Sequence, residues 1–236
     1  MTFLAGLRTA MRRRIAGVLL SAGVSPNAVT VAGTIGVLAG VVWYGATGGL
    51  LAGVIVVAVS SYADLLDGEM ARMGDRRTTG GAFLDSTLDR LADGAIFGCL
   101  AYRLLLDGRQ RAAALALVCL VAAYMVSYSR ARAESLGYRG EFGMTPRFVR
   151  LEIIGAGALL AGLGVPYTLE AALWVLAAAS TLTVVQRMAY VMRQADAADT
   201  AERGRRRSAR REGEGSSARP DRPASHVDDR TRPEPR

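Results

Sequence analysis

The sequence predicts an all-α integral membrane protein: a bundle of six transmembrane helices preceded by an amphipathic helix in the membrane interface. Three observations favour this fold: a hydrophobic fraction of 51%, six apolar runs nearly free of charge, and arginine clusters that recur between alternate runs. The runs cover residues 28–44, 50–63, 94–106, 112–128, 151–166 and 171–185. A bilayer core about 30 Å thick needs roughly 20 mainly apolar helical residues, and several runs reach that length with their polar ends included. A soluble bundle of unusually apolar helices is the alternative.

Residues 1–22 are predicted to form the interfacial helix. Its apolar side chains share one helical face, with arginines beside them. They are Leu4, Leu7, Met11, Ile15 and Val18. The competing interpretation is a signal peptide, because Arg12–Arg14 precede the apolar stretch IAGVLLSAG. No small-residue cleavage pattern is clear and a full apolar span follows at once, so the interfacial helix is favoured.

Residues 23–193 are predicted to hold the six spans. Pro26 fits the first turn of the first span and Ser25 can cap it, so this span runs from there to about Tyr44. The second span is expected from Leu50 to near Arg72 as one helix. The connections between spans are expected at 45–49, 73–81, 107–108, 128–150 and 164–168.

The distribution of arginine predicts the orientation in the membrane. The loops at 45–49 and 164–168 contain no arginine, whereas the N-terminus, 72–81, 128–150 and the C-terminal region contain clusters. Since basic loops face the cytoplasm, we expect a multi-pass protein of the plasma membrane with both termini inside.

The C-terminal region, residues 194–236, is predicted to be a disordered cytoplasmic tail. It has almost no aliphatic residues, and 201–236 contain 11 arginines and 7 acidic residues. Such a segment cannot bury a core, although its charge suits anionic lipid headgroups. Nucleic-acid binding would need more than charge.

Histidine and cysteine chemistry is disfavoured. His226, the only histidine, lies in the tail, so imidazole-based catalysis is disfavoured. Cys99 and Cys119 lie in apolar runs, as expected for buried thiols.

Four aspartates stand at the edge of the apolar runs. Asp64 and Asp67 are three residues apart, and Asp85 and Asp89 are four apart, so each pair shares a helical face. A short loop joins the second and third spans, which predicts antiparallel neighbours whose carboxylates face one another. Asp93 continues the second stripe inward.

Four unpaired carboxylates at an apolar boundary would repel one another. Two divalent cations remove this conflict, and oxygen-only ligands suit Mg²⁺ or Mn²⁺. Paired metals are a recurrent means of binding phosphates and stabilising displacement at phosphorus. The alternative is that the aspartates form salt bridges with Arg72, Arg76 and Arg90.

The full pattern, Asp64-x2-Asp67-Gly68-x2-Ala71-Arg72-x8-Gly81-x3-Asp85-x3-Asp89, resembles the signature of the CDP-alcohol phosphatidyltransferases over roughly residues 20–190. That family transfers a phosphatidyl group from a CDP-lipid to a hydroxyl acceptor and releases CMP. The resemblance implies that Asp64, Asp67, Asp85 and Asp89 hold two metal ions and that Asp89 is also the catalytic base. It further implies CDP-lipid contacts from Ser25, Pro26, Asn27, Ala28, Gly68, Arg72 and Thr78, and it suggests a homodimer.

The acceptor is expected to carry phosphate, because several arginines lie on the cytoplasmic side. They are Arg130, Arg132, Arg147 and Arg150. The stretches SPNAVTVAG, DGAIFG, SYSRARAES and VQR resemble the actinobacterial phosphatidylinositol phosphate synthases, which join CDP-diacylglycerol to inositol 1-phosphate. This chain departs from that subfamily at Asn27, where aspartate is usual, at Arg130, where lysine is usual, and in PRFVR at 146–150, which lacks the expected acidic residues.

Other functions stay open at this stage. The same chemistry with glycerol 3-phosphate or another polar alcohol would need the same aspartates. A cation transporter would use the aspartates as a relay, but relays need ionisable groups through the midplane, and these gather at one end. A membrane-anchored lipid- or nucleic-acid-binding protein would depend on the tail.

Overall fold

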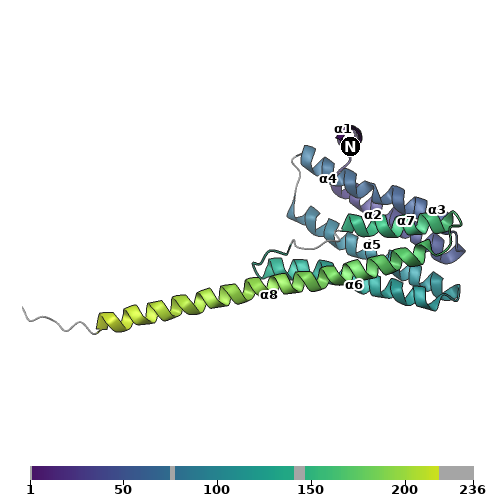
Figure 1. The fold of residues 1–236 in the computed structure, drawn as a ribbon. Helices are drawn as coiled ribbons and strands as arrows, with labels where there is room; N and C mark the ends of the chain where they lie inside the picture. Colours follow the sequence, from purple (N-terminus) through teal and green to yellow (C-terminus); the bar gives the residue numbers. More distant parts are fainter. Residues whose placement is uncertain (1, 75–77, 141–146, 218–236) are drawn as a thin grey trace, which may run out of the picture. The chain divides into compact units, whose positions relative to one another are not determined.

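The computed structural model describes residues 2–74, 78–140 and 147–217, and within these ranges the chain forms helices and no strand. Contacts divide the chain into two units, Met1–Val191 and Met192–Arg236. The first unit holds α1 to α7 and the first part of α8 (Figure 1). The prediction of an all-α protein is confirmed.

The first two helices are α1 (Thr2–Ser21) and α2 (Pro26–Thr47). The predicted cap of α2 is confirmed: Ser25 has extended backbone geometry and its hydroxyl accepts a hydrogen bond from the Ala28 N–H at 3.2 Å. Pro26 occupies the first turn, where its missing N–H costs nothing. Gly48 ends α2 in the left-handed region, at a φ of 74° that favours glycine.

The predicted second span is two helices rather than one. α3 (Leu50–Ser61) is almost wholly apolar, and α4 (Ala63–Met73) carries the first two aspartates. The Tyr62 N–H is shared between the carbonyls of Ala58 and Val59, both at 3.2 Å, so the last turn of α3 tightens before α4 begins. The break separates the apolar part of the span from its charged end.

The remaining helices are α5 (Thr79–Leu106), α6 (Gln110–Ser135), α7 (Arg147–Gly162) and α8 (Thr168–Ser217). Thr78 caps α5, its hydroxyl accepting from the Gly81 N–H at 3.0 Å. The expected turn at 107–108 is confirmed, with Gly108 at a φ of 71°.

Four helical segments of the described chain are long and apolar enough to cross a bilayer. They are Pro26–Thr47, Leu50–Met73, Gln110–Ser135 and Thr168–Arg206. α7 has only 16 residues, and α5 carries Asp85, Asp89 and Asp93 along its length. Six helical segments thus stand where the sequence predicts spans, while the number that crosses the membrane stays a prediction.

The C-terminal region differs from its expectation. The sequence predicts disorder from residue 194, but α8 continues to Ser217. Alanine, glutamate and arginine are strong helix formers, and Arg206 pairs with Glu202 at 2.5 Å across one turn. A shortage of apolar residues therefore prevents a core but not a helix. Residues 218–236 of the predicted tail lie outside the described residues.

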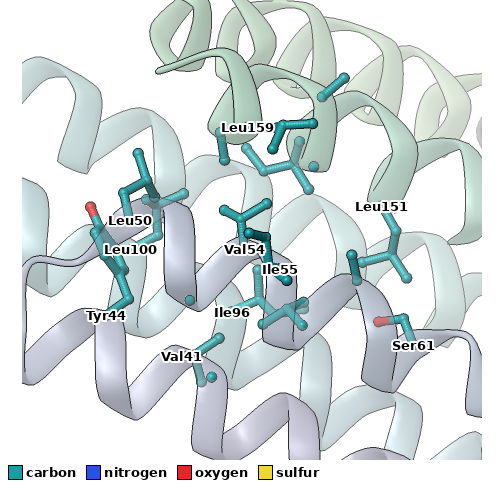
Figure 2. A pocket seen from close by; sticks show the side chains of 18 of the residues that line it. Val41, Tyr44, Leu50, Val54, Ile55, Ser61, Ile96, Leu100, Leu151 and Leu159 are labelled. Carbon is teal, nitrogen blue, oxygen red and sulfur yellow. The ribbon is translucent and has the colours of Figure 1, made fainter. Parts of the chain in front are cut away.

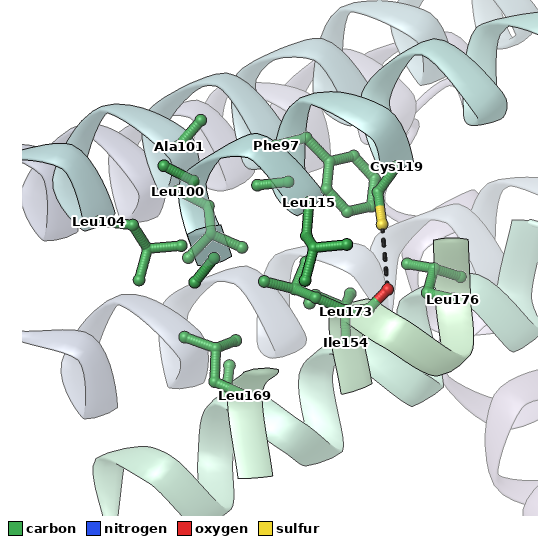
Figure 3. Packing of buried hydrophobic residues seen from close by; sticks show 14 of the residues in the cluster. Phe97, Leu100, Ala101, Leu104, Leu115, Cys119, Ile154, Leu169, Leu173 and Leu176 are labelled. Carbon is green, nitrogen blue, oxygen red and sulfur yellow. Dashed lines mark hydrogen bonds between the residues drawn. The ribbon is translucent and has the colours of Figure 1, made fainter. Parts of the chain in front are cut away.

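The main core of the first unit lies where α5, α6, α7 and α8 meet (Figure 3). Phe97, Leu100 and Leu104 of α5 pack with Leu169, Leu173 and Leu176 of α8. Cys119 is buried as predicted, and its thiol lies 3.4 Å from the Leu173 carbonyl. A second cluster, Val37, Val41, Ala92 and Ile96, fixes α2 against α5. Both clusters include residues of α5, the helix that carries two of the four predicted metal-binding aspartates.

Candidate functional site

Asp67 on α4 is held by the first turns of α2. Its side chain is buried, and one carboxylate oxygen accepts a hydrogen bond from the Thr30 hydroxyl at 2.5 Å. Thr30 is itself buried, and its hydroxyl lies 3.1 Å from the Pro26 carbonyl. Asp64 lies one turn earlier on α4, and its side chain is outside the described residues.

Asp85 and Asp89 lie one turn apart on α5. Asp85 is exposed, whereas Asp89 is half-buried and its Oδ1 lies 2.7 Å from Arg147 Nη1 of α7. Arg90 contributes a weaker contact to Asp89 at 3.7 Å. The expected acceptor residue Arg147 therefore lies directly against the expected catalytic base.

Asp93, one further turn along α5, gathers three arginines although it is 1% exposed. Arg150 Nη2 lies 3.2 Å from its Oδ2, Arg90 Nη1 lies 3.4 Å from the same oxygen, and Arg147 Nε lies 3.5 Å from Oδ1. Arg150 is also buried. Two carboxylates and three guanidinium groups leave one positive charge, so the α5–α7 junction favours an anion.

The alternative in which arginines serve only as salt-bridge partners of the aspartates holds in part. Arg90 does pair with Asp89 and Asp93. Arg72 instead pairs with Glu69, at 2.5 Å from its Oε2, and Arg76 lies outside the described residues.

The expected CDP-lipid residues occupy the N-terminal ends of α2 and α5 and the exposed face of α4. A Cβ at Gly81 would lie 3.0 Å from Asn27 Oδ1, so the start of α5 lies close to the Ser25–Ala28 turn and a larger residue would require the Asn27 side chain to shift. At Gly68 a Cβ would meet no atom within 4 Å, which leaves open space beside Asp67. Both α4 and α5 pack against α2.

The expected acceptor arginines divide into two groups. Arg147 and Arg150 join the α5 aspartates, as described above. Arg130 and Arg132 lie on α6 and are exposed, and Arg130 pairs with Glu134 at 2.8 Å. Among the described residues, the α7 pair forms ion pairs with the α5 aspartates.

Sequence reasoning did not single out Arg187 of α8, which the structure shows to be buried. It is 6% exposed, and its guanidinium donates a hydrogen bond to the Val126 carbonyl of α6. A buried arginine inside an apolar helix is by itself an indication of a functional site, and that signal is visible in VQR at 185–187. Ser127, the next residue of α6, accepts a hydrogen bond from Arg90.

The acidic set suits a hard divalent cation by chemistry, because every donor is a carboxylate oxygen and Asp67 is already fixed in orientation. Among the described side chains no group of three or more potential ligands gathers around one point. The metal-ligand set therefore stays a prediction from residue type and helical spacing, and the Asp64 side chain lies outside the described residues.

An apolar cavity of about 490 Å³ opens among α2, α3, α5 and α7 (Figure 2). Tyr44 and Leu50 line one end, Val54 and Leu159 the middle, and Ser61 the other end. Ser61 immediately precedes the break before α4, three residues from Asp64. The cavity therefore ends at the C-terminal end of α3, next to the aspartate-bearing helix in the chain, and its volume and apolar lining suit a hydrocarbon chain.

Comparison with known proteins identifies the family of this chain. The family model for CDP-alcohol phosphatidyltransferase matches residues 23–185. The phosphatidylinositol phosphate synthase of Streptomyces avermitilis is 41% identical over 194 residues, covering 79% of this chain and 80% of that protein. The enzyme of the same name from Mycolicibacterium smegmatis is 42% identical over 183 residues, covering 75% and 82%.

Solved structures of the phosphatidylinositol phosphate synthase of Mycobacterium tuberculosis are similar to this chain. The structure with CDP-DAG bound has a TM-score of 0.72 at 39% identity and covers 77% of this chain and 94% of that one. The complex with manganese and citrate has the same TM-score and identity, covering 77% and 88%.

Proposed function

We propose that this chain, which belongs to the CDP-alcohol phosphatidyltransferase family, transfers a phosphatidyl group from CDP-diacylglycerol to inositol 1-phosphate (1D-myo-inositol 3-phosphate). The products are phosphatidylinositol phosphate and CMP. The names of its relatives and the CDP-DAG complex of one of them support this reaction. The structural observation that carries it is the junction of α5 and α7, where the Asp89 carboxylate lies 2.7 Å from the Arg147 guanidinium.

Asp64, Asp67, Asp85 and Asp89 are the proposed ligands of two Mg²⁺ or Mn²⁺ ions, in agreement with the manganese complex of a relative. The bound ions would supply positive charge to the pyrophosphate and improve CMP as a leaving group. Thr30 orients Asp67 through the 2.5 Å hydrogen bond to its carboxylate.

Asp89 is the proposed base that takes the proton from the acceptor hydroxyl. It is half-buried and lies between exposed Asp85 and buried Asp93 on α5, where a soluble alcohol can reach it. Arg147 beside it would bind the acceptor phosphate and so bring the hydroxyl toward the base.

The remaining arginines complete the acceptor site in this proposal. Arg150 holds its place through buried Asp93 and contributes charge at the junction. Arg130 and Arg132 on α6 would contact the acceptor from the solvent side, where both are exposed. Arg187 of α8, whose guanidinium donates a hydrogen bond to the Val126 carbonyl of α6, is proposed as a further source of positive charge.

The donor would lie across the ends of α2, α4 and α5. Its CDP part would contact the Ser25–Ala28 turn, Gly68, Arg72 and Thr78. Support comes from the open space at Gly68 and the close approach of Gly81 to Asn27. One acyl chain would enter the apolar cavity that begins at Ser61.

The chain is a membrane protein. Its placement in the plasma membrane, with both termini and the active site in the cytoplasm, follows from the arginine distribution as part of the proposal. A homodimer stays a prediction from the family resemblance.

The test is CMP release from CDP-diacylglycerol by the purified protein with Mg²⁺ or Mn²⁺. Inositol 1-phosphate, glycerol 3-phosphate and free inositol are supplied in parallel, because arginines recognise phosphate rather than a particular polyol. We expect release that requires inositol 1-phosphate and falls by at least about a hundredfold in Asp89→Asn.

If glycerol 3-phosphate were the sole acceptor that supports CMP release, the proposed phosphatidyl transfer would stand and the proposed acceptor would be wrong. Release that survives Asp89→Asn would remove the role of Asp89 as base. No metal-dependent release with any acceptor would contradict the proposed reaction.

A further inference from the structure

Glu69 on α4 lies outside the aspartate pattern and is nevertheless buried, at 8% exposure. A buried carboxylate needs partners, and both of its oxygens have one. Oε1 accepts a hydrogen bond from Arg13 Nε at 3.1 Å, and Oε2 accepts from Arg72 Nη2 at 2.5 Å and from Arg72 Nε at 3.2 Å. One side chain therefore connects the end of α4 with α1.

The link between α1 and α4 is also a packing contact. Ala16 of α1 is fully buried, and a Cβ at Gly17 would lie 3.7 Å from the terminal methyl of Met73, an ordinary van der Waals distance. The two helices pack against each other. Arg13 stands one turn before Ala16, so it reaches Glu69 from a helix that is already docked.

The charges in this triad do not balance. Two guanidinium groups share one carboxylate, which leaves one positive charge. The Arg13 and Arg72 side chains are 68% and 51% exposed, so both guanidinium groups are accessible to a ligand from solvent. Guanidinium groups in such a position bind phosphate oxygens.

Resting on the proposed function, we propose that Glu69 is a positioning residue for the CDP-lipid donor. It holds Arg72 and Arg13 side by side so that both meet the donor's pyrophosphate. The interfacial helix α1 thereby forms part of the donor site rather than serving only as a membrane anchor. The acceptor side depends on α5, α6 and α7, so it does not depend on Glu69.

The test measures CMP release from mixed micelles while CDP-diacylglycerol and inositol 1-phosphate are varied separately. The variants are Glu69→Gln, Arg72→Gln, Arg13→Gln and the Glu69→Gln/Arg72→Gln double variant. Glu170→Gln is the matched control, since it breaks another ion pair between helices, with Arg109 at 3.7 Å, away from this site.

We expect Glu69→Gln to raise the KM for CDP-diacylglycerol about fivefold, the scale of one ordinary hydrogen bond, with kcat and the acceptor KM changed less than about twofold. Arg13→Gln should raise the donor KM alone, by about twofold to threefold. The increase in donor KM in the double variant should be smaller than the product of the increases in the Glu69→Gln and Arg72→Gln variants, because both substitutions disturb the same interaction.

The inference would be overturned if the Glu69→Gln substitution raised the donor and acceptor KM values equally. It would also be overturned if the donor-KM increases of Glu69→Gln and Arg72→Gln simply multiplied in the double variant. Either result would assign Glu69 a purely structural role. If Glu69→Gln does not fold, Arg13→Gln decides: an unchanged donor KM overturns the inference. The wild-type protein separates the two claims, because absence of CMP release from it contradicts the proposed function itself.

Discussion

Asp89 and Asp93 lie one turn apart on α5, and their surroundings assign them different tasks. Asp89 is half-buried, so a substrate can reach it, and its carboxylate pairs with Arg147, which also contacts Asp93. Asp93 is enclosed by Arg90, Arg147 and Arg150 and is 1% exposed. A carboxylate as enclosed as Asp93 cannot meet an acceptor, but it can hold in place the arginines that we propose to bind one.

Asp93→Asn is expected to destabilise the protein by about 3 kcal/mol, because it removes the charge partner of buried Arg150. Thermal unfolding in detergent measures the change, and Glu202→Gln, which breaks an exposed ion pair with Arg206 at 2.5 Å, is the control. An unfolding temperature equal to that of the control would show that Arg150 does not depend on Asp93.

At this scale the sequence predicts the residues whose partners are close in the chain. The Ser25 cap depends on Ala28, three residues away, and the helical spacing of Asp85 and Asp89 is local. Thr30 and Asp67 are 37 residues apart, and Arg13 and Glu69 are 56 apart. Nothing in either local sequence specifies that the two members of such a pair meet. The contacts of Thr30 and Glu69 are therefore known only once the helices are seen packed together.

At the scale of elements, the division of the second span into α3 and α4 separates two environments. α3 supplies the apolar wall of the cavity, and α4 supplies the carboxylates. Hydrophobicity predicts a single segment because both parts lie within one long, mainly apolar stretch, and the shared hydrogen bond of Tyr62 that ends α3 is a detail of backbone geometry.

Gly155→Leu tests whether the cavity receives an acyl chain. Gly155 lines the cavity, and a Cβ there would meet no atom within 4 Å, so leucine is expected to occupy the space rather than disturb the fold. The KM for long-chain CDP-diacylglycerol should rise roughly fivefold, the scale of one or two displaced methylene contacts. A donor with very short chains should show little change.

Gly98→Leu is the matched control, since its Cβ position on α5 is equally open but does not line the cavity. Initial rates with long-chain and short-chain donors give the comparison. A loss that is the same for both donors, or the same in both variants, would mean that the cavity does not hold the chain.

At the scale of the whole molecule, the two contact units suggest a division between catalysis and attachment. The first unit, Met1–Val191, contains all of the candidate site residues, and the family model ends at residue 185. The domain boundary at residues 193 and 194 stays a prediction, which rests on the loss of aliphatic residues after that point. The sequence does not predict the helix beyond it, because alanine, glutamate and arginine support a helix without any core.

Removal of residues 194–236 is therefore expected to leave kcat and both KM values within about twofold of the full chain. The 11 arginines and 7 acidic residues of 201–236 give that region a net positive charge, which favours anionic lipid. The truncated protein should accordingly lose only a salt-sensitive contribution to rates on vesicles that contain anionic lipid. Rates on neutral and anionic vesicles, at low and high salt, distinguish this effect from a catalytic one. A large fall in activity on neutral vesicles would instead place the C-terminal region within the catalytic machinery.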